Sequence, residues 1–293
     1  MSHILKNDIL EIVIDLPNEN YKFSRFDWTG QIVSVKLRGI YVSVDESPND
    51  QNIETQGRGL FNEFDIESPQ TFGATDIGEQ FHKIGIGQLT KELANYDFLY
   101  PYPVHPALFH VERYDDSINI TCDSESPHGL SYILQKSISL DENQLIIEYL
   151  LKNSGTATIQ TTEYTHNFLG ISGHAIGPDY ELHLPFFIKQ HSLAEYVNPG
   201  KAVQINQNSF TFNQTPHDPF FFSNLSGDQL VPATWTLYHK NSGIVISERC
   251  DFRTHKINLW GMGHVISPEI FHHIHVPTGQ SRSWKRIYTF HKN

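Results

Sequence analysis

The chain has 293 residues, and its 33 acidic and 21 basic side chains give a formal net charge of −12. This charge, without any run of basic residues, excludes nucleic acid or an anionic membrane surface as the main partner. The composition includes 19 Phe, 13 Tyr and 4 Trp but only 2 Met, which favours sheets over helix bundles.

The ends of the chain and its cysteines predict a compartment. The first residues lack an apolar leader, and no later run of 18 apolar residues could span a membrane. Cys122 and Cys250 are isolated and lack metal-ligand spacing, so we expect two free thiols in a reducing environment. The sequence therefore predicts a soluble, cytoplasmic protein and leaves its oligomeric state open.

Short strand-like segments begin near the N-terminus, at residues 9–16, 21–28, 31–37 and 41–44. A series of hairpins follows, because the turn-forming stretches 115–117, 141–143 and 153–155 each separate two apolar runs. The nearly continuous apolar run 145–151 predicts a strand covered on both faces. Further strands are expected at residues 180–187, 233–239, 243–248, 256–259, 265–276 and 283–290.

No segment of 12 or more residues has the periodicity of an amphipathic helix, and no linker or repeat divides the chain. These patterns predict an all-β fold, a large antiparallel β-sandwich that forms a single domain over residues 1–293.

The segment from Thr161 to Phe168 is the centre of this prediction. On a strand, Tyr164, His166 and Phe168 point to one side, and the residues between them point to the other. An imidazole between two aromatic rings near a strand end could act as an acid or base. A core histidine satisfied by the backbone is the alternative.

Two glycine-containing segments contain further candidates. Gly57 and Gly59 flank Arg58, with Glu63 close behind; this pattern fits either close approach to a ligand or a turn with a surface arginine. Residues 81–87 lack the spacing of a phosphate-binding loop, so we expect a strand end that presents His82 or Lys83 to a cleft.

The segment 267–275 places Glu269, Phe271, His273 and His275 on one face of a strand. A His-x-His pair on a strand can bind a metal ion. Small cupin barrels use such a pair with a glutamate a few residues later, and no glutamate follows His275 here. We therefore predict no metal site and keep the metal-binding interpretation as an alternative.

Four passages of this sequence resemble the galactose mutarotase-like superfamily, which contains the aldose 1-epimerases. The resemblance is closer to a bacterial branch whose members are mostly uncharacterised. The passages occur in the expected order and together span roughly residues 22–290: residues 25–30, 57–64, 81–87, and 164–168 with 177–179.

The resemblance implies a β-supersandwich whose concave sheet holds a monosaccharide. It implies that His166 is the general acid and Glu269 the general base of an anomer interconversion, on opposite sides of the sugar and without a cofactor. The implied substrate-binding residues are Arg58, Glu63, His82, Lys83, Asn167 and Asp179, with Asp218 as the alternative to Asp179 and with either His82 or Lys83 as the residue that contacts the sugar.

Three alternatives remain open at this point. The protein could bind a carbohydrate without turnover, because His166 and Glu269 could hydrogen-bond a hydroxyl without transferring a proton. It could act on an acidic or phosphorylated sugar bound by Arg58 and Lys83. The third alternative is the metal site. For the epimerase, we expect His166, Glu269, Arg58 and Lys83 to line one pocket.

Overall fold

The structure is a computed structural model that describes residues 2–47, 53–125 and 128–293. Within these ranges the chain is almost entirely β, with 52% of residues in strands and 4% in helices. The helices are short 3₁₀ segments at Ile53–Thr55, Phe72–Ala74, Gln190–Ser192 and Pro199–Lys201. Among the described residues, no helix has the length and apolar character needed to cross a membrane.

Ten strands form the first large sheet, and every pairing is antiparallel. Their spatial order is β1 (His3–Lys6), β2 (Leu10–Asp15), β3 (Gln31–Leu37), β5 (Leu60–Phe64), β13 (Ile159–Asn167), β22 (Val265–Val276), β21 (Ile257–Met262), β18 (Phe220–Phe222) and β15 (Tyr196–Val197), with β4 (Ile40–Tyr41) beside β3.

The second large sheet also has ten antiparallel strands. Their order is β16 (Val203–Ile205), β17 (Ser209–Phe212), β14 (Tyr180–His183), β19 (Val231–His239), β20 (Ile244–Thr254), β23 (Ser281–Lys292), β12 (Gln144–Asn153), β11 (Tyr132–Asp141), β10 (Ser117–Ser124) and β9 (Leu108–Arg113). A small third sheet contains β6 (Gln80–Lys83), β7 (Gly87–Thr90) and β8 (Val104–Pro106).

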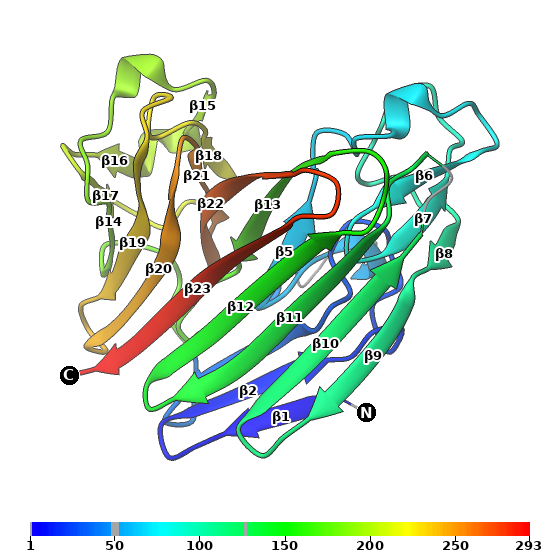
Figure 1. The fold of residues 1–293 in the computed structure, drawn as a ribbon. Helices are drawn as coiled ribbons and strands as arrows, with labels where there is room; N and C mark the ends of the chain where they lie inside the picture. Colours follow the sequence, from blue (N-terminus) through cyan, green and yellow to red (C-terminus); the bar gives the residue numbers. More distant parts are fainter. Residues whose placement is uncertain (1, 48–52, 126–127) are drawn as a thin grey trace.

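The two large sheets pack face to face, with the small sheet at one end (Figure 1). Their inward-facing side chains form one contiguous apolar cluster, to which both sheets contribute. For example, Ile12 and Ile14 of β2 and Leu134 and Ile138 of β11 are all fully buried in it. Alternation of apolar and polar residues along each strand therefore produces the predicted β-sandwich.

The predicted hairpins are confirmed at residues 115–117 and 141–143, where β10 and β12 each pair with the preceding strand in the chain. The prediction for residues 153–155 is wrong. After Asn153 the chain leaves the second sheet, and β13 pairs with β5 and β22 of the first. Asn153 secures this crossing by donating to the carbonyl oxygens of Ala157 and Val276.

Two strand predictions are also corrected. Residues 21–28 contain no strand and form an extended loop against the first sheet. The apolar run 145–151 is covered on one face only, because Glu148 and Leu150 of β12 are exposed while Ile147 and Leu151 are fully buried.

Candidate active site

A cavity with a volume of about 950 Å³ lies over the central strands, on the face of the first sheet that points away from the second. Strands β13, β22, β21 and β18 form its floor, and the loops around residues 25, 46, 56, 66 and 97 form its walls. Its lining side chains are Arg25, Glu46, Gln56, Ile66, Glu67, Tyr96, Asp97, Phe98, Leu99, Tyr164, His166, Phe221, Lys256, Asn258, Trp260, Glu269 and Phe271.

Two of the predicted site residues meet on this floor. The Nδ1 atom of His166 on β13 lies 3.1 Å from Oε1 of Glu269 on β22. Both side chains are 6–7% exposed and line the cavity. Ser267, two residues before Glu269, donates its hydroxyl hydrogen to the same carboxylate oxygen at 3.2 Å. A titratable imidazole and a carboxylate are therefore in direct contact at a cavity surface.

A second carboxylate holds the other side of the imidazole. The Nε2 atom of His166 lies 2.9 Å from Oε2 of Glu63, on the neighbouring strand β5. The hydroxyl of Tyr164 donates to the same oxygen at 3.0 Å. The ring of His166 also stacks on Phe168 and meets Phe26 edge-on. These contacts define one orientation of the imidazole.

The surroundings of His166 favour its charged form. Burial alone would lower the pKa of His166, but the charge of Glu269 and hydrogen bonds to Glu269 and Glu63 raise it above the ordinary value. As an imidazolium, the ring donates from both nitrogens, one to each carboxylate. His166 is therefore suited to give a proton, and Glu269 is placed to take one.

Arg25 forms part of the wall beside this pair. Its guanidinium makes two hydrogen bonds with Glu46, at 2.9 and 3.0 Å, and its Nε atom lies 3.7 Å from Glu63. It also packs over the ring of Phe98 at 5.3 Å. Because Glu46 satisfies the fork of Arg25, this arginine shapes the wall and is not free to bind an anion.

Aromatic rings cover much of the remaining lining. Phe271 stacks on Tyr164 with ring centroids 4.3 Å apart, and Trp260 meets Phe168 edge-on. Trp260 is half-buried, so part of its ring faces the cavity. Apolar rings beside a few placed polar groups are typical of small-molecule binding sites.

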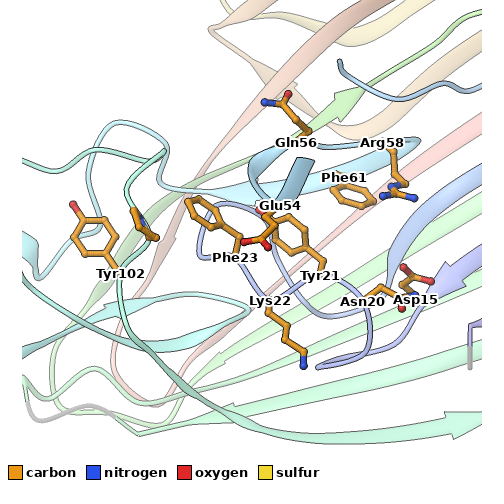
Figure 2. A pocket seen from close by; sticks show the side chains of 11 residues that line it. Asp15, Asn20, Tyr21, Lys22, Phe23, Glu54, Gln56, Arg58, Phe61 and Tyr102 are labelled. Carbon is orange, nitrogen blue, oxygen red and sulfur yellow. The ribbon is translucent and has the colours of Figure 1, made fainter. Parts of the chain in front are cut away.

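The sequence-based placement of Arg58 in this pocket is wrong. Its side chain is 45% exposed, lies 3.9 Å from Asp45, and lines a different cavity of about 450 Å³ (Figure 2). The two glycines around it serve packing: a Cβ on Gly57 would collide with the ring of Phe168, and one on Gly59 with the carbonyl of Ile32. These two glycines therefore permit close packing within the protein and not the close approach of a ligand.

The neighbouring residues His82 and Lys83 of β6 are both buried. His82 packs edge-on against Tyr132 at 4.8 Å and lies outside the cavity lining. Lys83 donates to the Tyr96 hydroxyl at 2.9 Å and lies 3.7 Å from Glu63. The charge of Lys83 therefore stabilises the carboxylate of Glu63. Neither His82 nor Lys83 is in position to contact a ligand.

Asn167 and Asp179 also lie elsewhere. Asn167 points into the sandwich, where its amide donates to Glu248 at 3.2 Å and to the carbonyl of Pro268 at 2.6 Å. Asp179 accepts a hydrogen bond from Asn241 beside the second sheet. Among the described residues, neither of these side chains nor Asp218 is part of the cavity lining.

Comparisons with known proteins agree with this architecture. The "Slr1438 protein" of Synechocystis sp. PCC 6803 superposes with a TM-score of 0.61 at 11% identity, covering 100% of this chain and 96% of that one. A protein described as a "putative aldose 1-epimerase" from Escherichia coli K12 gives 0.62 at 10% identity, with 100% and 99% covered. A "galactose mutarotase-like protein" from Lactobacillus casei ATCC 334 gives 0.58 at 13% identity, with 99% and 100% covered.

The chain has the galactose mutarotase-like fold. No family model and no curated protein matches the sequence itself. At 10–13% identity, the structural likeness establishes the fold alone. What this version of the fold does must be argued from the side chains of its own cavity.

The metal alternative finds no support in the part of the chain described. No group of three or more His, Cys, Asp or Glu side chains there is arranged to hold a metal ion. His273 and His275 lie further along β22 from the cavity and are exposed. Glu269 shares their face of the strand, as predicted, but its contacts are with His166 and Ser267.

Several lining residues were missed from the sequence. Tyr96, Asp97 and Phe98 come from a loop after β7, and Lys256 and Asn258 come from β21 and the turn before it. Periodicity could have predicted the face of Asn258 and Trp260, which share the alternation of β21. The loop residues carry no such signal, because only tertiary packing brings them over the sheet.

Proposed function

We propose that this protein interconverts the α and β anomers of an aldose by acid–base catalysis, with Glu269 as the base and His166 as the acid. The observation that carries the proposal is the 3.1 Å contact between His166 Nδ1 and Glu269 Oε1 at the cavity floor. The shared fold with proteins described as aldose epimerases and mutarotases is consistent with it.

The reaction needs two coupled proton transfers. Glu269 takes the proton from the hydroxyl at C1, while His166 gives its Nδ1 proton to the ring oxygen as the bond from C1 to that oxygen breaks. The open-chain aldehyde turns about the bond from C1 to C2, and closure on the other face returns both protons. Each transfer of this kind is typically worth about 10²–10⁴-fold in rate.

The geometry changes one sequence-based expectation. We expected His166 and Glu269 on opposite sides of the sugar ring, but they are adjacent, with 3.1 Å between Nδ1 and Oε1. Both reacting oxygens are bonded to C1, so a neighbouring acid and base can reach them together from one side. In the proposed complex, these two oxygens replace the direct contact between the side chains.

The charges of the lining favour a neutral sugar over an acidic or phosphorylated one. The cations Arg25 and Lys256 are paired with Glu46 at 2.9 Å and with Glu67 at 3.3 Å. The two residues expected to bind an anion cannot do so in this cavity, because Arg58 lines another cavity and Lys83 is fully buried. An anionic group here would meet a surplus of carboxylates.

Polarimetry tests the proposal. A panel of pure single anomers of neutral aldoses is dissolved fresh, and optical rotation is followed with and without protein. We expect faster mutarotation of at least one aldose, in proportion to protein concentration and lost in Glu269→Gln. If a sugar binds, as shown by a thermal shift, but the protein never accelerates its mutarotation, the protein is a carbohydrate-binding protein instead.

A further inference from the structure

Glu63 is enclosed by other side chains and lies close to charged groups, which a residue that contacts a substrate does not require. Its side chain is 0% exposed, so a ligand in the cavity cannot touch it. One carboxylate oxygen, Oε2, accepts hydrogen bonds from Nε2 of His166 at 2.9 Å and from the hydroxyl of Tyr164 at 3.0 Å. The Nε atom of Arg25 lies 3.7 Å from the same oxygen. The other oxygen lies 3.7 Å from Lys83 Nζ.

These partners keep Glu63 an anion inside the protein. Burial alone would raise the pKa of Glu63, but the hydrogen bond from His166 and the charges of Lys83, His166 and Arg25 hold it below the ordinary value. A fully buried carboxylate is strongly unfavourable unless it is paired in this way. Three elements of the fold, namely β13, β6 and the loop before β3, thus converge on the charge of Glu63.

We propose that Glu63 is a positioning residue, which holds the His166 ring in place and keeps it doubly protonated so that its Nδ1–H faces Glu269 and the cavity. This inference rests on the proposed function for its effect on turnover, but not for its effect on His166 itself. It replaces the sequence-based assignment of Glu63 as a substrate contact.

A count of the charges around His166 gives the same result. Glu63 faces it from β5, Glu269 from β22 and Arg25 from the loop before β3, while Lys83 lies behind Glu63. Glu46 neutralises Arg25. The buried carboxyl group of Asp65 interacts with Lys83 as well. With four carboxyl groups and two permanent cations, this cluster carries a surplus of negative charge that favours a positive His166.

Either carboxylate alone would leave the imidazole less well defined. Without Glu63, the ring could turn or deprotonate at Nε2, and the proton available at Nδ1 would be held more weakly at neutral pH. In Glu63→Gln, the side chain keeps its shape and can still accept a hydrogen bond from Nε2 of His166, but it cannot balance the positive charge of the imidazolium. This variant therefore tests the charge of Glu63 separately from its shape.

Nuclear magnetic resonance of the histidine ring nitrogens in the intact ¹⁵N-labelled protein tests this inference without any substrate. His166 is one of 17 histidines, so its signals are assigned by their loss in His166→Asn. We expect both ring nitrogens of His166 to carry a proton in the wild type at pH 7.5. In Glu63→Gln, the pKa of His166 should fall by about one unit or more, because an opposite charge at hydrogen-bond distance is lost. In Glu63→Asp, which keeps the charge, it should stay closer to the wild type.

Glu163→Gln is the matched control. Glu163 is also 0% exposed and lies on β13, but it faces the opposite side of the strand and pairs with Arg286 at 2.8 Å. Its loss should lower stability and leave the titration of His166 unchanged. An equal shift in both variants would mean general loosening of the sheet and would overturn the inference.

Further readouts separate this inference from the proposed function. If the wild type accelerates mutarotation, Glu63→Gln should lower kcat with little change in KM and move the alkaline limb of the kcat/KM profile down by the same amount as the His166 pKa. Turnover with an unchanged pKa of His166 in Glu63→Gln would overturn the inference alone. A shifted pKa in a protein without turnover would overturn the proposed function and support the inference. If Glu63→Gln does not fold, a wild-type His166 with only one protonated nitrogen at pH 7.5 would still overturn it.

Discussion

Arg286 of β23 donates two hydrogen bonds to Glu163 of β13, at 3.1 and 2.8 Å, across the interior between the two sheets. Glu163 lies three residues before His166 on the same strand and faces away from the cavity. Arg286 also donates to Glu248 of β20 at 2.6 Å. The strand that carries the candidate acid is thus fixed from behind by a fully buried ionic cluster.

Replacing Arg286 with Met should therefore destabilise the protein strongly. The methionine fills similar space but leaves Glu163 and Glu248 buried without their cation, a loss of about 3–5 kcal/mol in the free energy of unfolding. Urea denaturation followed by tryptophan fluorescence measures it. As a control, Lys285→Met on the same strand removes an exposed pair with Glu148 and should change stability by at most about 1 kcal/mol. Equal midpoints for the two variants would contradict this account.

Glu269→Gln and His166→Asn should each remove about 10²–10⁴-fold of any mutarotase activity. Glutamine keeps the size of Glu269 and a hydrogen-bonding oxygen but has no basicity, so sugar binding should largely survive. Polarimetry gives the rate, and thermal unfolding gives the folded fraction in parallel. If His166 is only a core residue, its replacement would lower stability and leave the activity per folded molecule unchanged.

The double variant of His166 and Glu269 provides a separate test. Because both groups serve one concerted proton relay, the second substitution should cost much less than the first. Rate losses that multiply fully would show that the two residues act in independent steps, and the proposed pairing would then be wrong.

Sugar binding should change the fluorescence of one tryptophan. Trp28, Trp235 and Trp284 are 1–3% exposed in the core, whereas Trp260 is half-buried at the cavity. A sugar whose mutarotation the protein accelerates should therefore alter the tryptophan emission of the wild type. In Trp260→Phe, that change should disappear, and KM should rise a few-fold because a smaller ring remains for stacking. A sugar-dependent change that persists in Trp260→Phe would place the ligand elsewhere.

Strand periodicity predicted correctly which faces of two strands carry the side chains on the cavity floor. The alternation around Tyr164 and His166, and around Glu269 and Phe271, put these four side chains on the faces that meet at the cavity. Two strands that are paired in the sheet bring them together, although 103 positions separate His166 from Glu269. Period-two patterns decide the face of a residue, whereas the choice of His166 and Glu269 as a candidate acid and base came from the family resemblance.

Two of the failures lie outside the named strands. Arg58 forms an isolated bridge with Asp45 and Asp179 lies in a turn, and in neither place does periodicity fix the direction of a side chain. The crossing at residues 153–155 has the same turn-forming residues as a hairpin, and only the pairing of β13 with β5 and β22 distinguishes the two. Local sequence defines a turn well, but long-range packing decides which elements the turn connects.

His82 provides a prediction about acid stability. Burial lowers the pKa of His82 to about 4, because its ring is enclosed next to Tyr132 and the charged form loses its hydration. In the unfolded chain the ordinary value is about 6.5. Between these two values the unfolded state binds more protons than the folded state, so this stability is complete above pH 6.5 and is lost as pH falls towards 4.

The variant His82→Leu should remove this dependence. Leucine fills the same apolar space, and the backbone N–H of residue 82 still donates to the hydroxyl of Thr71. The difference in free energy of unfolding between variant and wild type should therefore shift in favour of the variant by up to about 1.4 kcal/mol per pH unit as pH falls from 6.5 to 4. Urea denaturation at several pH values measures this difference, in which the titrations of all other groups, including His166 and His272, cancel. A difference that stays constant over this range would show that His82 is already hydrated or protonated in the folded protein, and the burial argument for it would fail.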